Sequence, residues 1–317
     1  MELERYEGNP LLTPTRNWWE TKAVFNCAAA RSNGKVHILY RAMGDDNVSR
    51  FGYASTENGL DVARRDDIPN YESVGDELER LGVEDPRITR IDDTYYITYT
   101  GVSLYPCSET RPSPLKSVPW RCRVGLISTK DFKTYRKHGC ILPDMDNKDV
   151  VLFPEKIKGK YVLLHRTFPN IWMAYSEDMM NWHDHRLLMR IQPDSWDCNR
   201  IGAGAPPIKT EEGWLNFYHG VDHQRNYRLG IMLLDLEDPT QVIGQCPEFI
   251  LTPREQYERC GEVPNVVFSN GAILEPDGEL KVYYGAADTC IGLATCQVDD
   301  LIEACLEGIR PERTISY

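Results

Sequence analysis

The chain has 317 residues, of which 41% are hydrophobic and 26% are charged, so it can bury a large core and is not a mainly disordered chain. Its 36 Lys and Arg against 48 Asp and Glu give a formal net charge of −12, which argues against nucleic-acid and anionic-membrane partners. No apolar run approaches the roughly 20 residues that a membrane-spanning helix needs.

The cysteine pattern and the first residues bear on location and metal content. The first ten residues are polar and acidic, unlike a secretory signal. There are ten cysteines and no CxxC, and the closest pair, Cys290 and Cys296, is six residues apart, which argues against a thiolate zinc site. We therefore expect reduced thiols, a cytoplasmic protein, and no metal or other cofactor.

A short apolar strand recurs five times along the chain, each time after a Gly or Asp turn and ending in Tyr or His. The five segments are 36–40, 95–99, 161–165, 214–218 and 280–284. Their last residues are Tyr40, Tyr99, His165, Tyr218 and Tyr284, spaced by 59, 66, 53 and 66 positions. A repeat at this period is typical of architectures built from one supersecondary unit.

A second strand follows in each unit, at 51–55, 124–128, 171–176, 229–234 and 291–295. Five such units predict an all-β, five-bladed β-propeller forming a single domain over residues 1–317, because stacking around an axis buries both faces of each small sheet. An irregular β-sandwich is the alternative. A helix is indicated only at 299–307, within a C-terminal tail at about 299–317. The Pro- and Ser-rich stretch at about 104–120 is expected to be a loop inserted in the second unit.

Polar residues gather around the first strand of each unit, where propeller blades converge on the axis. The third and fourth units supply mainly cations, and the second and fifth supply carboxylates. Lys148, Arg166, Arg200 and His219, brought to one pole, would form an anion site, because Arg forks and Lys charges match phosphate. The alternative is that each is a solvated charge or pairs with a neighbouring Asp.

Asp85 is the strongest candidate for a general acid. It lies between Glu84 and Pro86, whose fixed φ holds the chain extended before the next strand. A partly desolvated carboxyl beside sugar hydroxyls can donate a proton. The alternative is an Asp that caps a turn through backbone N–H groups.

Eight short motifs, in order from residue 25 to residue 288, resemble glycoside hydrolase family 130, the β-mannoside phosphorylases and their hydrolytic relatives. They begin at Phe25 (FNCA), Leu39 (LYR), Glu84 (EDPRI), Asn147 (NKDVVLFPEK), Leu164 (LHR), Arg200 (RIGAG), Tyr218 (YHGV) and Tyr283 (YYGAAD). The resemblance covers nearly the whole chain. It implies a five-bladed propeller and an inverting phosphorolysis of a β-mannoside that releases α-mannose 1-phosphate.

The resemblance also implies residue roles. Asp85 would be the proton donor, acting through the 3-hydroxyl of mannose, and inorganic phosphate would be the co-substrate. The phosphate-binding residues would be Lys148, Arg166, Arg200 and His219, and the mannose-binding residues Asn26, Arg41 and Asp288. A phosphorylase needs only the acid, because phosphate is already an anionic nucleophile. A β-mannosidase on the same fold and a non-catalytic carbohydrate-binding propeller remain alternatives.

Some positions depart from the family pattern. Cys27 stands where a small hydroxyl residue or Ala is often found, so its contact with ligand is open, and Glu84 stands where some relatives carry Tyr, which bears on the acceptor side. The sequence favours a β-1,2-mannooligosaccharide as substrate, with β-1,4-mannosyl-glucose or β-1,4-mannosyl-N-acetylglucosamine as the alternatives. Because relatives are often oligomeric, a homo-oligomer is compatible with the resemblance.

Overall fold

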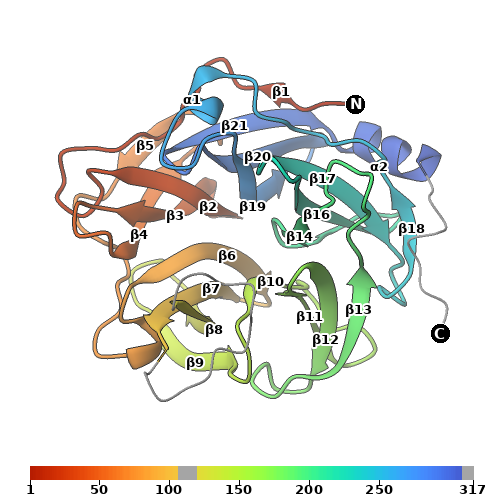
Figure 1. The fold of residues 1–317 in the computed structure, drawn as a ribbon, viewed down its shortest axis with the longest axis horizontal. Helices are drawn as coiled ribbons and strands as arrows, with labels where there is room; N and C mark the ends of the chain where they lie inside the picture. Colours follow the sequence, from red (N-terminus) through yellow and green to blue (C-terminus); the bar gives the residue numbers. More distant parts are fainter. Residues whose placement is uncertain (106–119, 309–317) are drawn as a thin grey trace.

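Five antiparallel sheets surround a central axis in a computed structural model of the chain, which describes residues 1–105 and 120–308 (Figure 1). This confirms the predicted all-β, five-bladed propeller. The strands nearest the axis are β2 (Ala23–Ser32), β6 (Val83–Ile91), β10 (Lys148–Leu152), β14 (Arg200–Ala203) and β19 (Val267–Leu274).

Each blade continues outward from its inner strand through antiparallel neighbours. Blade 1 adds β3 (Lys35–Met43), β4 (Ser49–Thr56) and β5 (Val62–Arg65); blade 2 adds β7 (Thr94–Leu104), β8 (Trp120–Thr129) and β9 (Arg136–Leu142). Blade 3 adds β11 (Tyr161–Thr167), β12 (Asn170–Ser176) and β13 (His183–Met189). Blade 4 adds β15 (Ile208–Lys209), β16 (Trp214–Val221), β17 (Tyr227–Leu234) and β18 (Val242–Gln245), and blade 5 adds β20 (Glu279–Ala286) and β21 (Cys290–Gln297).

The ring closes through the start of the chain. Strand β1 (Glu4–Arg5) pairs antiparallel with β21 and completes blade 5. The first strand of the chain thus joins the sheet formed by its last three strands. The Arg5 guanidinium donates to both carboxylate oxygens of Glu258, at 2.8 and 2.9 Å, next to the short helix α1 (Gln256–Arg259). Because the Glu258 side chain is fully buried, this pair fastens the closing strand to the core.

All ten strands expected from the repeat are present, but the innermost strand of each blade was not predicted. Strand β2 shows why, since its first eight residues are all buried. A strand buried on both faces lacks the apolar–polar alternation by which strands are recognised in a sequence. The repeat therefore located the second and third strands of each blade rather than the first.

The aromatic ends of the repeated strands have a common structural cause in four blades. Each is a buried Tyr directly across from a Gly: Tyr40 and Gly52, Tyr99 and Gly125, Tyr218 and Gly230, Tyr284 and Gly292. A Cβ at any of these glycines would lie 2.2 to 2.5 Å from the nearest ring atom, so only Gly leaves room for the ring. Blade 3 departs from this pattern and pairs His165 with Trp172.

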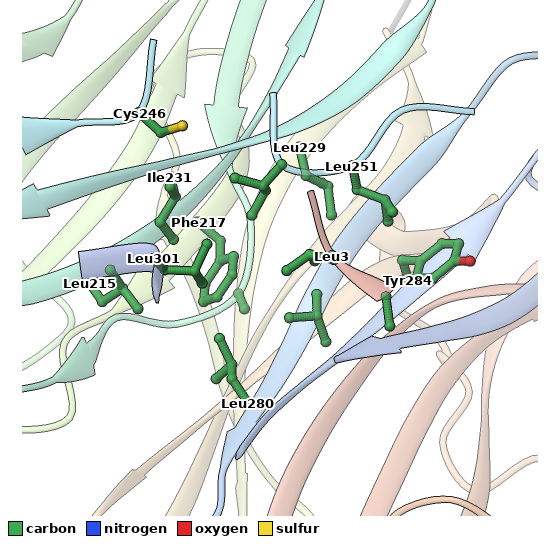
Figure 2. Close-up of a cluster of buried hydrophobic side chains, with 14 of the residues drawn as sticks. Leu3, Leu215, Phe217, Leu229, Ile231, Cys246, Leu251, Leu280, Tyr284 and Leu301 are labelled. Carbon is green, nitrogen blue, oxygen red and sulfur yellow. The ribbon is translucent and has the colours of Figure 1, made fainter. Parts of the chain in front are cut away.

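The core lies between neighbouring blades. Figure 2 shows one such cluster, between blades 4 and 5, where Phe217 and Leu280 pack with Leu3 from the N-terminal segment and Leu301 from helix α2 (Val298–Glu307). The predicted C-terminal helix is thus confirmed. Of the expected inserted loop and tail, residues 106–119 and 309–317 lie outside the described residues. Among the described helices, none has the length and apolar character required to cross a membrane.

Candidate active site

A polar cavity of about 450 Å³ opens at the axis and brings together seven of the eight predicted site residues. Those seven are Asn26, Arg41, Asp85, Lys148, Arg166, Arg200 and Asp288. The eighth, His219, is fully buried and lies behind the cavity, with Nε2 3.5 Å from a guanidinium nitrogen of Arg166. The cavity also takes in residues for which the sequence suggested no role: Trp120, Cys122, Asp149, Arg225, Tyr227, Val266 and Phe268.

The inner strands of blades 1, 2 and 3 carry the same local distortion at corresponding positions. Asn26, Asp85 and Asp149 have left-handed φ values of 46°, 53° and 57°, and each lies where the pairing register with the next strand shifts. A β-bulge of this kind redirects a side chain, and Asn and Asp tolerate the left-handed region best among non-glycine residues. The repeat thus turns three polar side chains into the cavity.

Asp85 is held by two neighbours on the mannose side of the predicted site. Its Oδ1 accepts hydrogen bonds from the Asn26 side-chain amide at 2.8 Å and from Arg41 at 3.3 Å. Burial opposes ionisation of Asp85, but the positive charges of Arg41, Lys148 and Arg87 outweigh it and hold the pKa of the carboxyl below its usual value. Without a bound ligand, Asp85 is therefore a carboxylate at neutral pH.

Glu84 connects the predicted mannose-binding and phosphate-binding residues. One carboxylate oxygen accepts from Arg41 at 2.7 Å and the other from Lys148 Nζ at 2.8 Å. Burial opposes the charged form of Lys148, yet Glu84 outweighs it and raises the pKa of the ammonium. Glu84, which was expected to bear on the acceptor side, thus bridges two cations of the site.

Asp149 organises the cationic side of the cavity. Its carboxylate accepts from Arg87 at 3.0 Å and lies 2.7 Å from a guanidinium nitrogen of Arg166. Burial opposes ionisation here as well, but the positive charges of Arg166 and Arg87 outweigh it and lower the pKa of Asp149. Because Asp149 and Arg87 are almost fully buried, the carboxylate fixes where the Arg166 guanidinium can point.

His219 is a neutral ring in this network. Burial lowers its pKa to about 3, so at neutral pH it adds no positive charge to the predicted anion site. Its Nε2 lies 3.5 Å from a guanidinium nitrogen of Arg166 and 3.7 Å from a carboxylate oxygen of Asp149. The geometry therefore places His219 as a support for Arg166, while Lys148, Arg166 and Arg200 carry the charge that faces the cavity.

Blade 4 supplies the opposite wall. The Arg200 side chain donates to the hydroxyl of Tyr227 and lies over its ring, with the guanidinium carbon 5.2 Å from the ring centroid. Arg225, in the turn after β16, has a left-handed φ of 67° and also reaches the cavity. Arg200 is the first residue of β14, and Arg225 lies between β16 and β17. Both therefore lie at or beside the end of a strand.

Asp288 differs from Asp85 although both line the cavity. Burial raises the pKa of Asp288 to about 7, and the negative charges of Asp85 and Glu84 act in the same direction, against the attraction of Arg41. Two carboxyl groups whose environments push their pKa values apart can hold different protonation states at one pH. Near pH 7 Asp85 is therefore ionised, whereas Asp288 is about half protonated.

This protonation state makes a prediction for stability. The pKa of Asp288 is about 7 in the folded state against 3.8 ordinarily, so the folded protein binds a proton that the unfolded chain has released between these values. Stability should therefore fall as pH rises from about 4 to about 7, by on the order of a few kcal/mol. Asp288→Asn should remove this fall, as measured by urea unfolding at pH 5 and pH 8.

Asp222→Asn is a control variant whose effect on stability should depend on pH in the opposite direction. The pKa of Asp222 is lowered although burial opposes this, because Asn226 and Arg228 bind its carboxylate. Asp222→Asn should therefore cost more stability at pH 8 than at low pH. If Asp288→Asn and the wild type lose the same amount of stability between pH 5 and pH 8, the inferred rise in the pKa of Asp288 is wrong.

Two observations bear on cysteines and metals. Cys27 is fully buried within the core between blades 1 and 5 and does not line the cavity, whereas Cys122 does. Across residues 1–105 and 120–308, no group of three or more His, Cys, Asp or Glu side chains is arranged to hold a metal ion.

Comparisons with known proteins show the family to which the chain belongs. The family model "Glyco_hydro_130: beta-1,4-mannooligosaccharide phosphorylase" matches residues 4–307. A 1,2-beta-oligomannan phosphorylase of Thermoanaerobacter sp. (strain X514) is 42% identical over 310 residues, covering 95% of this chain and 99% of the relative. A beta-1,2-mannobiose phosphorylase of the same organism is also 42% identical, over 316 residues, covering 93% and 97%.

Among solved structures, the beta-1,2-mannobiose phosphorylase from Listeria innocua in complex with beta-1,2-mannobiose superimposes with a TM-score of 0.83 at 31% identity. The match covers 96% of this chain and 99% of that chain.

Proposed function

Because the chain belongs to glycoside hydrolase family 130, we propose that it is an inverting β-mannoside phosphorylase that removes a terminal non-reducing mannose with inorganic phosphate and releases α-mannose 1-phosphate. The observation that carries this proposal is the cavity itself, where Lys148, Arg166 and Arg200 face a carboxylate, Asp85, across one space. In a protein of net charge −12, such a cationic wall is a specific arrangement for an anionic reactant.

In the proposed reaction the cationic wall holds phosphate against the anomeric carbon of the mannose. Arg166, oriented by Asp149, offers a fork of N–H donors, and Lys148 adds a point charge. Asn26, Arg41 and Asp288 hold the mannose ring. Positioning the nucleophile in line replaces the general base that an inverting hydrolase needs.

Proton donation by Asp85 requires that its carboxyl be protonated, and the unliganded site keeps it ionised. Phosphate brings negative charge beside Lys148 and weakens the field that stabilises the carboxylate, so its binding raises the pKa of Asp85. The proton then passes to the departing sugar through the mannose 3-hydroxyl. In this scheme the acid becomes competent when the nucleophile is in place.

The carboxylates of the site favour phosphorolysis over hydrolysis. A water-activating base must be an ionised carboxylate free to accept a proton. Glu84 is tied to Arg41 and Lys148, and Asp149 is tied to Arg87 and Arg166, while Asp288, with a pKa of about 7, is about half ionised at neutral pH. Glu84 and Asp149 are therefore not free to act as a base, and phosphate needs none.

For the substrate, we propose a β-1,2-linked mannooligosaccharide, supported by the two relatives at 42% identity, which are named for β-1,2-linked substrates. The family model is described by a β-1,4 activity, so β-1,4-mannosides remain the comparison to test. We also propose a cytoplasmic location, supported by the nine described cysteines, which are all free thiols.

The test is to incubate the protein with β-1,2-mannobiose, β-1,4-mannobiose and β-1,4-mannosyl-N-acetylglucosamine, each with and without phosphate. We expect mannose 1-phosphate from β-1,2-mannobiose, and only when phosphate is present. Free mannose at equal rates with and without phosphate would instead make the protein a hydrolase. Product from a β-1,4 substrate alone would keep the phosphorylase and overturn the linkage.

A further inference from the structure

A second cavity, of about 440 Å³, lies between blades 2 and 3, outside the catalytic cavity. Its walls are the end of β9 and the following segment on one side, and His165, Trp172 and His185 of blade 3 on the other, with Trp182 at one end. We name this space the inter-blade groove. The proposed reaction assigns it no role.

The inter-blade groove exists because blade 3 breaks the Tyr–Gly pattern of the other four blades. In those blades the Tyr hydroxyls reach outward to buried partners: Glu20, Glu79, Gln245 and Glu258. In blade 3 the corresponding residue is His165, whose shorter ring leaves the outer part of this space open, and Trp172 replaces the Gly. The groove thus lies at the blade that has His165 and Trp172 in place of the Tyr–Gly pair.

The groove shares a wall with the catalytic cavity. Successive residues of a strand point to opposite faces. Accordingly Lys148 and Arg166 face the catalytic cavity, while their chain neighbours Asn147 and His165 line the groove. Asn147 donates to His165 Nδ1 at 2.9 Å and accepts from the backbone N–H of Arg166 at 3.2 Å. The two spaces are therefore separated by a single pair of chain segments.

The groove fits a neutral, hydroxyl-rich ligand, because Asp144 is the one Asp, Glu, Lys or Arg among its described lining residues. Burial lowers the pKa of His165 to about 3, so this ring is neutral and offers no charge to an anion. Since its Nδ1 accepts from Asn147, its Nε2 donates to Nδ1 of His185 at 3.0 Å. His185 itself is exposed, and its Nε2, with Asn181 and Thr167, supplies hydrogen-bonding groups along the wall.

Two indole rings complete the lining. Trp182 is half-buried, and its N–H donates to the backbone oxygen of Met179 at 3.0 Å, which holds the ring in place. Trp172 lies directly across the sheet from His165. Rigid aromatic surfaces beside neutral hydrogen-bonding groups combine apolar contact area with specific polar contacts, which is what a sugar ring requires.

We propose that the inter-blade groove is a second carbohydrate-binding site, which takes a mannosyl residue of an oligosaccharide chain. The identity of the sugar rests on the proposed function, whereas the presence of a neutral polyhydroxyl site rests on the groove alone. The site would retain longer mannan chains at the enzyme while the catalytic cavity processes their ends.

Binding can be measured without turnover by titrating the protein with a β-1,2-mannohexaose in phosphate-free buffer by calorimetry. We expect two binding events for the wild type. Trp182→Ala and His185→Ala should each lose one event or weaken it at least about tenfold. His185 is exposed, so that variant tests the site even if Trp182→Ala fails to fold. Trp18→Ala, which removes an indole that is 61% exposed on blade 1, is the matched control and should keep both events.

Phosphorolysis of β-1,2-mannobiose by the same preparations separates this proposal from the proposed function. We expect both variants to turn over mannobiose within about twofold of the wild type and to show a raised KM for the hexaose. A single binding event in the wild type, or unchanged titrations in both variants, overturns the second site even when mannobiose is cleaved. Failure to cleave mannobiose while two binding events persist overturns the enzyme assignment and leaves the second site standing.

Discussion

Asp85→Asn is expected to lower kcat for phosphorolysis by roughly 10²- to 10⁴-fold, the range that a positioned general acid contributes. The amide keeps the shape of the side chain and can still accept from Asn26, so the fold should persist. Arg41 retains Glu84 as a partner at 2.7 Å, which avoids leaving its charge unpaired. The measurement is kcat and KM for β-1,2-mannobiose and for phosphate, with phosphate affinity preserved.

Asp288→Asn is the matched control for this assignment. It replaces a second carboxyl of the cavity, whose pKa is raised to about 7 by burial, with a neutral amide. If Asp85 is the acid, Asp288→Asn should raise the KM for the mannoside while kcat stays within about tenfold of the wild type. The reverse pattern, with kcat lost in Asp288→Asn and kept in Asp85→Asn, would transfer the role of the acid to Asp288.

The repeat in the sequence predicted most of the fold because it reflects a structural rule. The Tyr at the end of each repeated strand, such as Tyr40, needs a Gly across from it, and this pair recurs in four blades. The inner strands were not found, since β2 is buried on both faces and carries no alternation. Their bulges at Asn26, Asp85 and Asp149 depend on pairing register, which a sequence does not display.

For the site, position relative to the repeat was a good guide to which residues meet, but not to what they do there. Seven of the eight predicted residues line one cavity. The expectation that His219 adds to the cationic set did not anticipate its complete burial, which keeps the ring neutral. The ion pairs of Glu84 and Asp149 were not foreseen either, because their partners are distant in the sequence. Glu84 pairs with residues 43 and 64 positions away, and Asp149 pairs with residues 17 and 62 positions away.

Asp149→Asn is expected to damage both stability and phosphate use. The buried carboxylate faces Arg87 at 3.0 Å and Arg166 at 2.7 Å. Removing one partner of a buried ion pair leaves an uncompensated charge, which costs about 3–5 kcal/mol. Arg166 also loses the group that orients it, so kcat/KM for phosphate should fall by on the order of 10²-fold, the effect of a small misplacement of a reactant.

Comparing the effects on phosphate and on the mannoside distinguishes a role of Asp149 in orienting Arg166 from a purely structural role. In Asp149→Asn the KM for the mannoside should remain near the wild-type value, because Asn26 and Arg41 contact Asp85 rather than Asp149. Asp222→Asn is the control, since Asp222 also pairs with an arginine, Arg228 at 2.9 Å, without lining the cavity. It should leave both kinetic constants unchanged. Wild-type phosphate kinetics in a destabilised Asp149→Asn protein would show that Asp149 supports the fold alone and that Arg166 finds its orientation from phosphate itself.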